Sequence, residues 1–189
     1  MGFLFVNEYM YRIQLSAEPK TSEQKIIATI GNFDGLHLGH TELLGQLSQQ
    51  AKLDKSWRML ITFDVLPHEY FADKSGVLRA PRIGLLRDKV AILEQSGLVD
   101  EVVILHFSKY MAKLRAQDFI DEILRNKLGV SEMIVGHDFR FGYMAEGTIR
   151  DLTSSGIRTT EFAELKHNQV RVSSSLIREL AAEQNIELI

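Results

Sequence analysis

The sequence predicts an α/β fold, a parallel sheet with helices on both faces. Short apolar, β-branched runs that stop at a glycine alternate along the chain with segments whose apolar residues recur at helical spacing. The run at 57–63 is nearly continuous in apolar residues, which is typical of strands covered on both faces. The 189 residues suit one domain, and we find no internal repeat or low-complexity segment among them.

The first half of the chain starts this alternation. Residues 25–30 are a short β-branched run that ends at a glycine, so we expect a buried strand there. Leucines at helical spacing then predict a helix from about His40 onward. A second strand is expected at 57–63. Residues 64–82, which hold two prolines and a glycine among scattered charges, are expected to form a long loop.

The second half repeats the pattern. Apolar spacing predicts a helix that Gly97 ends and another that ends near Gly129, because glycine commonly follows the last helical residue. Strands are expected at 101–105 and 133–135, and the second of them also runs into a glycine. The remaining expected elements are a short helix at 148–154, a strand at 157–162, a short strand at 170–172 and a helix from about 174.

Composition limits the functional class. The chain has no cysteine, so disulfides and thiolate metal sites are excluded. Its formal net charge is −3, and the composition gives no sign of a concentrated basic face for nucleic acid. No apolar run approaches the ~20 residues that span a membrane, and the first residues lack the features of a signal peptide. We therefore expect a cytoplasmic protein without nucleic-acid or membrane partners.

The domain boundary is expected near residue 25. Residues 1–24 precede the first clear strand and are interpreted as a lead-in segment, whereas 25–189 are interpreted as one domain. Parallel sheets bind ligands in the crevice at the carboxyl ends of their strands. Two glycine-containing stretches, 31–40 and 136–142, and the start of the last helix are predicted to converge at that edge.

The stretch GNFDGLHLGH, residues 31–40, follows the first strand and opens a helix. Unpaired amides and the helix dipole make such a turn a ready phosphate site, and glycine lets a ligand approach the backbone closely. Neither the Walker pattern nor GxGxxG is present. His37 and His40 lie three residues apart, so both imidazoles can face one point.

Three interpretations of this histidine pair stay open on residue chemistry alone. The pair could bind a metal, although the usual third and fourth ligands are not nearby. It could instead donate hydrogen bonds to a phosphate whose charge grows in the transition state. It could also do no more than shape the turn.

Two further motifs follow later strands. GHDFRFG, residues 136–142, presents an acid and an arginine between two phenylalanines. RVSSSLIREL, residues 171–180, is a strand end, a serine run and a helix with an arginine one turn in. Serine is a natural N-cap, and hydroxyls, amides and a guanidinium together can hold an oxyanion.

These motifs together resemble a known family. An HxGH element inside a G-N-F-D-G frame is similar to the nucleotidyltransferase superfamily, and the fuller frame resembles the FMN adenylyltransferase module of bacterial bifunctional FAD synthetases. The resemblance runs from about residue 25 to 184. It implies a Rossmann-like fold of the nucleotidyltransferase type and an enzyme that transfers AMP from ATP to FMN, giving FAD and pyrophosphate.

The resemblance also implies residue roles. His37 and His40 are expected to stabilise the pentacoordinate phosphorus, and Arg178 is expected to help hold the leaving phosphates as a third catalytic residue. Ser175 stands where the family usually has threonine, which keeps the hydroxyl. Residues expected on the nucleotide side are Gly31, Asn32, Phe33, Asp34, Gly39, Asp138, Ser173, Ser174 and Ser175. Residues expected on the flavin side are Asp64, Phe71, Phe139, Arg140 and Phe141.

A fourth segment, TFDVLPHEYF at residues 62–71, departs from the family pattern. Val65 and Leu66 replace a Pro-His pair that the family often shows there. The departure leaves open another phosphorylated acceptor, such as a phosphopantetheine or nicotinamide mononucleotide. A non-catalytic protein that binds nucleotide or flavin is the alternative from a different class.

The expected reaction is in-line attack of the FMN phosphate on the α-phosphorus of ATP, which needs positioning and charge stabilisation more than a strong base. Mg²⁺ is expected to bridge the triphosphate through phosphate oxygens and water, without confident side-chain ligands. The bifunctional family carries a further riboflavin kinase domain after this module. The chain stops at Ile189, so none is expected here, and a separate riboflavin kinase is an expected partner.

Overall fold

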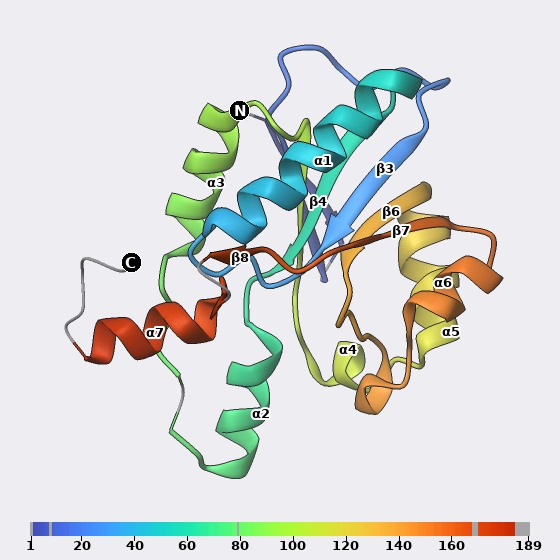
Figure 1. Cartoon of the computed structure of the whole chain (residues 1–189). Coiled ribbons are helices and arrows are strands. Elements are labelled where there is room, and N and C mark those ends of the chain that lie inside the picture. The colour runs from blue at the N-terminus through green and yellow to red at the C-terminus, as the bar shows by residue number, and fades with distance from the viewer. Residues whose placement is uncertain (1, 8, 79, 168–169, 184–189) are drawn as a thin grey trace.

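The computed structural model describes residues 2–7, 9–78, 80–167 and 170–183, with side chains from residue 9 onward except that of residue 167. A seven-stranded sheet in the order β1-β2-β5-β4-β3-β6-β7 forms the centre of the molecule (Figure 1). Its strands are β1 Gly2–Asn7, β2 Met10–Gln14, β3 Ile26–Ile30, β4 Trp57–Phe63, β5 Glu101–Leu105, β6 Val130–Gly136 and β7 Arg158–Phe162.

The central strands confirm the predicted parallel sheet. β3 pairs in parallel with β4 on one side and β6 on the other, β5 extends the sheet beyond β4, and β7 extends it beyond β6. The carboxyl ends of these five strands therefore meet at one edge. A separate two-stranded hairpin, β8 Lys166–His167 with β9 Val170–Arg171, contains most of the short strand predicted at 170–172.

The lead-in interpretation of residues 1–24 is wrong for the described part of that segment. β2 pairs antiparallel with β5, and β1 pairs antiparallel with β2, so the sheet is mixed. Met10 and Ile13 are buried in the core. Arg12 forms an ion pair with Glu101 on the neighbouring strand, which fixes β2 on this edge. These contacts join residues about ninety positions apart, so local sequence did not reveal the strand.

Helices cover both faces of the sheet, as predicted (Figure 1). Successive strand residues point to opposite faces. Ile27 and Leu60 pack with α1 and α3 in one core, whereas Ala28 and Met59 pack with η1 in the other. The helices are α1 Leu38–Asp54, α2 Pro67–Ser75, α3 Leu86–Ser96, α4 Lys109–Lys113, α5 Ala116–Asp118, the π-helix η1 Phe119–Lys127, the 3₁₀ helix η2 Tyr143–Ala145, α6 Ile149–Ser154 and α7 Ser174–Ala182.

The long loop predicted at 64–82 is wrong for its middle part, which forms α2. Pro67 occupies the first helical turn, where its missing N–H costs nothing. Glu69 accepts a hydrogen bond from the backbone of Leu66 at 2.8 Å, and Gly76 ends the helix in a left-handed conformation. Helix-start and helix-stop residues were therefore present in a segment that the sequence analysis interpreted as irregular.

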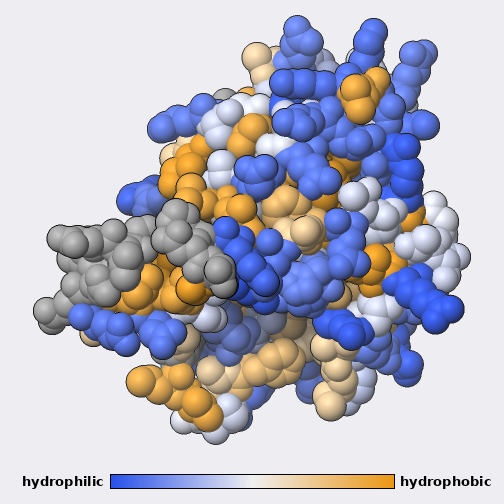
Figure 2. Space-filling model, in the orientation of Figure 1, coloured by the Kyte–Doolittle hydropathy of each residue, from blue (hydrophilic) through white to orange (hydrophobic). Residues whose placement is uncertain are grey.

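Apolar side chains gather at more than one place on the surface. Figure 2 shows hydrophilic side chains over much of the visible face, with apolar ones over the region of α3 and at the end of the molecule that α2 and the following segment form. Phe71, Val77 and Leu78 are exposed there. Among the described residues, no helix combines the length and apolar character needed to cross a bilayer.

Candidate active site

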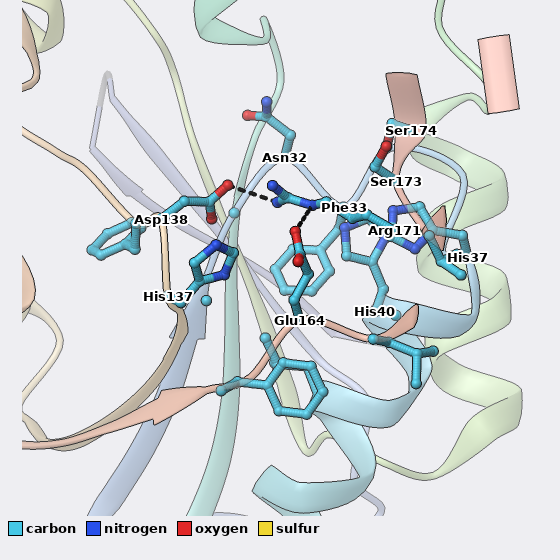
Figure 3. Close-up of a pocket in the computed structure, with 18 of the residues that line it drawn as sticks. Asn32, Phe33, His37, His40, His137, Asp138, Glu164, Arg171, Ser173 and Ser174 are labelled. Carbon is cyan, nitrogen blue, oxygen red and sulfur yellow. Dashed lines mark hydrogen bonds and ion pairs between the residues drawn. The ribbon is translucent and has the colours of Figure 1, made fainter. Parts of the chain in front are cut away.

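A polar cavity of about 320 Å³ opens at the carboxyl edge of the sheet. The loop after β3, the loop after β6 and the start of α7 meet around it, as the sequence predicted for three distant segments (Figure 3). We call it the polar cavity; its lining includes Gly31, Asn32, Phe33, His37, Gly39, His40, Gly136, His137, Asp138, Phe139, Glu164, Arg171, Val172, Ser173 and Ser174.

Two helix starts open onto this cavity. His37 is the N-cap of α1, and Ser173 is the N-cap of α7, where its hydroxyl accepts from the amide of Leu176 at 3.2 Å. The first amides of a helix lack internal partners and carry positive partial charge. Two such termini at one cavity favour an anion with several charged oxygens.

The imidazoles of His37 and His40 are stacked, with ring centroids 3.7 Å apart and planes 17° apart. Phe33 packs against His40 with ring centroids 4.9 Å apart. A side chain at Gly39 would crowd the His37 ring at 3.3 Å and the carbonyl of Val172 at 3.4 Å, so glycine lets the loop and the α7 segment approach. The predicted convergence of the two imidazoles on one cavity is thus present.

Both imidazoles are held neutral. The pKa of His40 is lowered to about 3, mainly by burial and in smaller part by the nearby His37 and Lys89. Burial also lowers the pKa of His37. The Nδ1 atoms of both rings are buried and have no hydrogen-bond partner among the described residues. A bound polyanion would favour protonation of these rings, because opposite charge stabilises the charged form.

The loop backbone is strained. Phe33 has φ 45° and Leu36 has φ 41°, both in the left-handed region that non-glycine residues rarely adopt. Phe33 is nevertheless buried, and Gly31 lies over its ring, where an added Cβ would stand 3.3 Å from Cε2. Such strain persists only where surrounding contacts hold it in place.

Asp34 supplies some of those contacts and does not line the polar cavity. Its buried carboxylate accepts from the amides of Ile83 at 3.0 Å and Gly84 at 3.4 Å. Its carbonyl oxygen accepts from Ser174 Oγ at 2.8 Å. It also forms an ion pair with Arg178. Asp34 therefore joins the first loop to α7 and to the segment before α3.

Arg178, expected in the oxyanion clamp, does not line the polar cavity. Its guanidinium binds the Asp34 carboxylate, and its Nε donates to the carbonyl of Pro81 at 2.7 Å. Ser175 also lies outside the lining, whereas Ser173 and Ser174 belong to it. The structure thus brings the serine run to the imidazoles while turning the arginine toward the segment before α3.

Arg171 is the arginine that does line the cavity, and the sequence analysis did not select it. Its Nη2 lies 2.6 Å from Asp138 Oδ2, and its Nε lies 3.0 Å from Glu164 Oε1 (Figure 3). Burial tends to raise the pKa of Asp138, but the hydrogen bond and charge of Arg171 outweigh it and the pKa is lowered. Arg171 opens the stretch RVSSSLIREL, two residues before the first serine, and this position was an available signal. Glu164 and His137 were also missed.

A second, larger hollow of about 620 Å³ lies beside the first. We call it the aromatic cavity; its lining is Ile30, Gly31, Asn32, Phe63, Pro67, Phe71, Phe107, Met111, Ala112, Phe119, Asp138, Phe139, Arg140, Phe141, Gly142, Met144 and Ala145. Five of these residues, Ile30, Gly31, Asn32, Asp138 and Phe139, also line the polar cavity. The two cavities therefore share a wall.

Aromatic rings give the second cavity its character. Phe139 and Phe141 are stacked with centroids 5.4 Å apart, and Phe107 lies edge-on to Phe63 at 5.6 Å and to Phe71 at 5.9 Å. Flat ligands of extended π character suit such a lining. Four of the five residues expected on the flavin side, Phe71, Phe139, Arg140 and Phe141, line this cavity.

Asp64, the fifth, does not line it. Its Oδ2 lies 2.7 Å from His106 Nδ1, and its Oδ1 accepts from the amide of Phe107 at 3.3 Å. It therefore joins the ends of β4 and β5. The aromatic lining from Phe63, Phe107 and Phe119 was missed, since these residues come from elements far apart in sequence.

Within the described residues, no three histidine, aspartate or glutamate side chains gather closely enough to hold a metal ion. The lining instead offers acceptors next to a site suited to an anion, such as the carboxylate of Asp138. A magnesium ion held mainly by the phosphates of a bound ligand and by water would suit such a lining, because Mg²⁺ keeps several waters and needs few protein ligands.

Residues 19–176 match the sequence model of the family described as FAD synthetase. The "Bifunctional riboflavin kinase/FMN adenylyltransferase" of Escherichia coli (strain K12) is 35% identical over 173 residues, which is 88% of this chain and 53% of that protein. The protein of the same name from Haemophilus influenzae is 35% identical over 85% of this chain and 52% of that protein.

The protein of that name from Buchnera aphidicola subsp. Acyrthosiphon pisum is 32% identical over 86% of this chain and 52% of that protein. The chain thus spans about half the length of the curated relatives that it matches. A solved structure titled "Crystal Structure of Macrolide-efflux Protein from Streptococcus pneumoniae" superposes with a TM-score of 0.69 at 24% identity, over 85% of this chain and 52% of that one. That likeness shows the fold and confirms the Rossmann-like α/β architecture.

Proposed function

Because the chain belongs to the FAD synthetase family, we propose that it transfers AMP from ATP to FMN and releases FAD and pyrophosphate. The observation that carries this proposal is the wall shared by the polar and aromatic cavities. A reaction between a triphosphate and a phosphorylated flavin needs an anion site and an aromatic site whose reactive ends meet.

The nucleotide is assigned to the polar cavity. The stacked imidazoles of His37 and His40 face the α-phosphate, where charge increases as the phosphorus becomes pentacoordinate. The start of α7, with Ser173 and Ser174, and the guanidinium of Arg171 receive the β- and γ-phosphates, which leave as pyrophosphate. In the protein alone, Arg171 is paired with carboxylates, so a triphosphate must compete for it.

The flavin is assigned to the aromatic cavity. Its rings can stack on Phe139 or pack against the edges of Phe107 and Phe71. The phosphate of FMN then lies near Asn32 and Asp138, which belong to both cavities, and faces the α-phosphorus. One P–O bond forms from the FMN phosphate oxygen, and the bond between the α-phosphorus and the bridging oxygen breaks.

Magnesium completes the proposed substrate. Mg²⁺ would neutralise the triphosphate through its oxygens and bound water, next to Asp138. The FMN phosphate is already a competent nucleophile near pH 7, so the chain need not supply a strong base. The work assigned to the protein is alignment of the two phosphates and stabilisation of the developing charge.

The cellular setting is part of the proposal. The curated relatives are named for both riboflavin kinase and FMN adenylyltransferase. This chain matches about half of the length of each of them. We therefore propose a cytoplasmic reaction in which a riboflavin kinase, as a further domain or a separate protein, supplies FMN. A nucleic-acid partner is not proposed, in keeping with the formal net charge of −3.

The test is direct. The purified protein is incubated with FMN, ATP and Mg²⁺, and FAD is separated by chromatography while pyrophosphate release is followed in parallel. Nicotinamide mononucleotide and a phosphopantetheine replace FMN in matched reactions. FAD formed with stoichiometric pyrophosphate supports the proposal. Pyrophosphate release with another acceptor alone, or nucleotide and flavin binding without pyrophosphate release, would contradict it.

A further inference from the structure

A buried lysine lies beneath the first loop and has no place in the chemistry described above. Lys89, on α3, lines neither the polar nor the aromatic cavity. Its Nζ donates to the carbonyl oxygen of Asn32 at 2.6 Å and to Oγ1 of Thr62 at 3.1 Å. Burial of an ammonium costs free energy unless hydrogen bonds or charges compensate it, so the contacts of Lys89 indicate its role.

The main acceptor of Lys89 is the backbone carbonyl of Asn32, in the first loop. The Asn32 carbonyl also accepts from Thr62 Oγ1 at 3.1 Å, so two donors hold one peptide group. That peptide group leads into Phe33, whose φ is 45° and whose ring packs against His40. Asn32 itself lines both cavities. The Lys89 ammonium thus binds the carbonyl of Asn32. This carbonyl directly precedes Phe33, the strained residue whose ring packs against His40.

We propose that Lys89 is a positioning residue for the AMP transfer, which binds the Asn32 carbonyl and thereby holds the strained loop so that Phe33 supports the His37–His40 stack. The expected effect of Lys89 on the reaction rate rests on the proposed function. Its expected effect on the imidazole stack rests on geometry alone. Without the ammonium, the carbonyl keeps one donor and the loop can relax toward ordinary φ values.

The electrostatic surroundings make this role dependent on pH. The pKa of Lys89 is lowered to about 8: burial is the largest cause, Arg82 acts in the same direction, and Asp34 and Glu69 act against it. Arg178 pairs with Asp34 and reduces the negative charge that reaches the ammonium. Lys89 is therefore charged below about pH 8 and neutral above it, where its bond to the carbonyl loses its charge-assisted strength.

The principal variant is Lys89→Met, which keeps an unbranched side chain out to the ε position and removes the ammonium donor. Lys89 is bound to neutral acceptors, and the Asn32 carbonyl keeps the Thr62 hydroxyl as a donor, so the change removes a costly buried ammonium and we expect the variant to fold. Lys52→Met is the matched control, because Lys52 is an exposed lysine in the last turn of α1. Circular dichroism and thermal unfolding establish that both variants are folded.

Two readouts are taken on each protein. The first is the rate of FAD formation at saturating substrates from pH 6.5 to 10. We expect kcat to fall by up to about 100-fold in Lys89→Met, because small misplacements of catalytic groups cost that much. In the parent protein the rate should decline with a midpoint near pH 8, and this limb should be missing from Lys89→Met.

The second readout does not need activity. The ring-proton resonances of His37 and His40 are recorded by NMR at pH 7.5, where both rings are neutral. Loss of the stack moves these resonances toward their unstacked positions in Lys89→Met but not in Lys52→Met. If Lys89→Met does not fold, the same resonances in the parent protein are followed from pH 7 to 10 and should move with a midpoint near 8.

The outcomes separate this inference from the proposed function. Failure of the parent protein to make FAD contradicts the proposed function and leaves the ring resonances to decide the role of Lys89. Unchanged ring resonances in Lys89→Met overturn the positioning role, whatever the rate does. A parent-like rate in Lys89→Met, or an alkaline limb that persists in it, overturns the claim that the reaction depends on this lysine.

Discussion

The polar and aromatic cavities lie side by side but are built in different ways. The polar cavity is made by backbone conformation: glycines, positive φ angles and two helix starts bring amides and imidazoles together. The aromatic cavity is made by side chains, with rings contributed by the end of β4, α2, the segment after β5, η1 and the loop after β6. The polar cavity is therefore indicated by short local sequence motifs, whereas the aromatic cavity is indicated by few.

The difference also separates two kinds of binding. An anion is held by amide dipoles, hydroxyls and a guanidinium, whose strength depends on exact direction and on charge. A flat ring system is held by contact area and ring geometry, which tolerate small losses. We therefore expect changes in the polar cavity to affect catalysis more strongly than changes of similar size in the aromatic cavity.

The largest effect is expected from the imidazoles. His37→Ala and His40→Ala should each lower kcat for FAD formation by about 10²–10³-fold, because each removes one preorganised group at the developing charge. FMN affinity, measured by quenching of flavin fluorescence, should stay within about threefold of the parent value, in keeping with the contact-dominated aromatic cavity. Parent-like turnover in both variants would remove the histidines from the mechanism.

Two arginine variants are expected to differ in which property they change, ATP affinity or stability. Arg171→Ala should raise the KM for ATP by about 10- to 100-fold, because a charge-assisted contact is worth ~1.5–3 kcal/mol. Arg178→Ala should instead lower the free energy of unfolding by about 3 kcal/mol, because it leaves the buried Asp34 carboxylate unpaired. Denaturant unfolding and steady-state kinetics on both variants check this.

The reverse result for these two variants would restore the expectation from the sequence. If Arg178→Ala keeps its stability but loses ATP affinity, the guanidinium must leave Asp34 to reach the phosphates. Asp34→Asn is the control for the pairing, since it keeps the shape of the side chain and removes its charge.

A smaller effect is expected in the aromatic cavity. Phe71 is 53% exposed, so Phe71→Ala should cost little stability while raising the Kd for FMN by roughly 3- to 10-fold. ATP affinity should not change. Ile92→Ala, at a residue of α3 that is 51% exposed and lines neither cavity, is the matched control. An unchanged Kd for FMN in Phe71→Ala would place the flavin elsewhere.

A further effect is expected in the pH dependence of stability. The folded-state pKa values of His37 and His40 are lowered, that of His40 to about 3. The unfolded chain therefore binds protons first, and the stability that these neutral rings contribute is present above pH 6.5 and is lost as pH falls toward 3. Urea unfolding between pH 7.5 and 5, before most carboxylates titrate, should show stability falling with pH. An equal slope in His40→Gln would contradict this source.

Much of the polar cavity could be predicted from the sequence because its signals are short. Gly39, the two histidines and the serine run stand within single motifs, and a glycine turn before a helix has few conformations. The roles of Asp34 and Arg178 could not be predicted in the same way. Each belongs to a motif, but whether its side chain faces the ligand or a neighbouring segment depends on residues 81–84, about fifty to a hundred positions away.

The sequence by itself determined the succession of the central strands and helices along the chain, and the edge of the sheet at which the three motifs meet. It did so because apolar periodicity and helix-start residues are patterns that extend over only a few positions. Tertiary structure alone decided that β1 and β2 extend the sheet, that Arg171 and not Arg178 lines the polar cavity, and that distant rings gather into the aromatic cavity. Strand pairing at a sheet edge and the direction of a side chain depend on contacts between distant residues, and no local pattern encodes them.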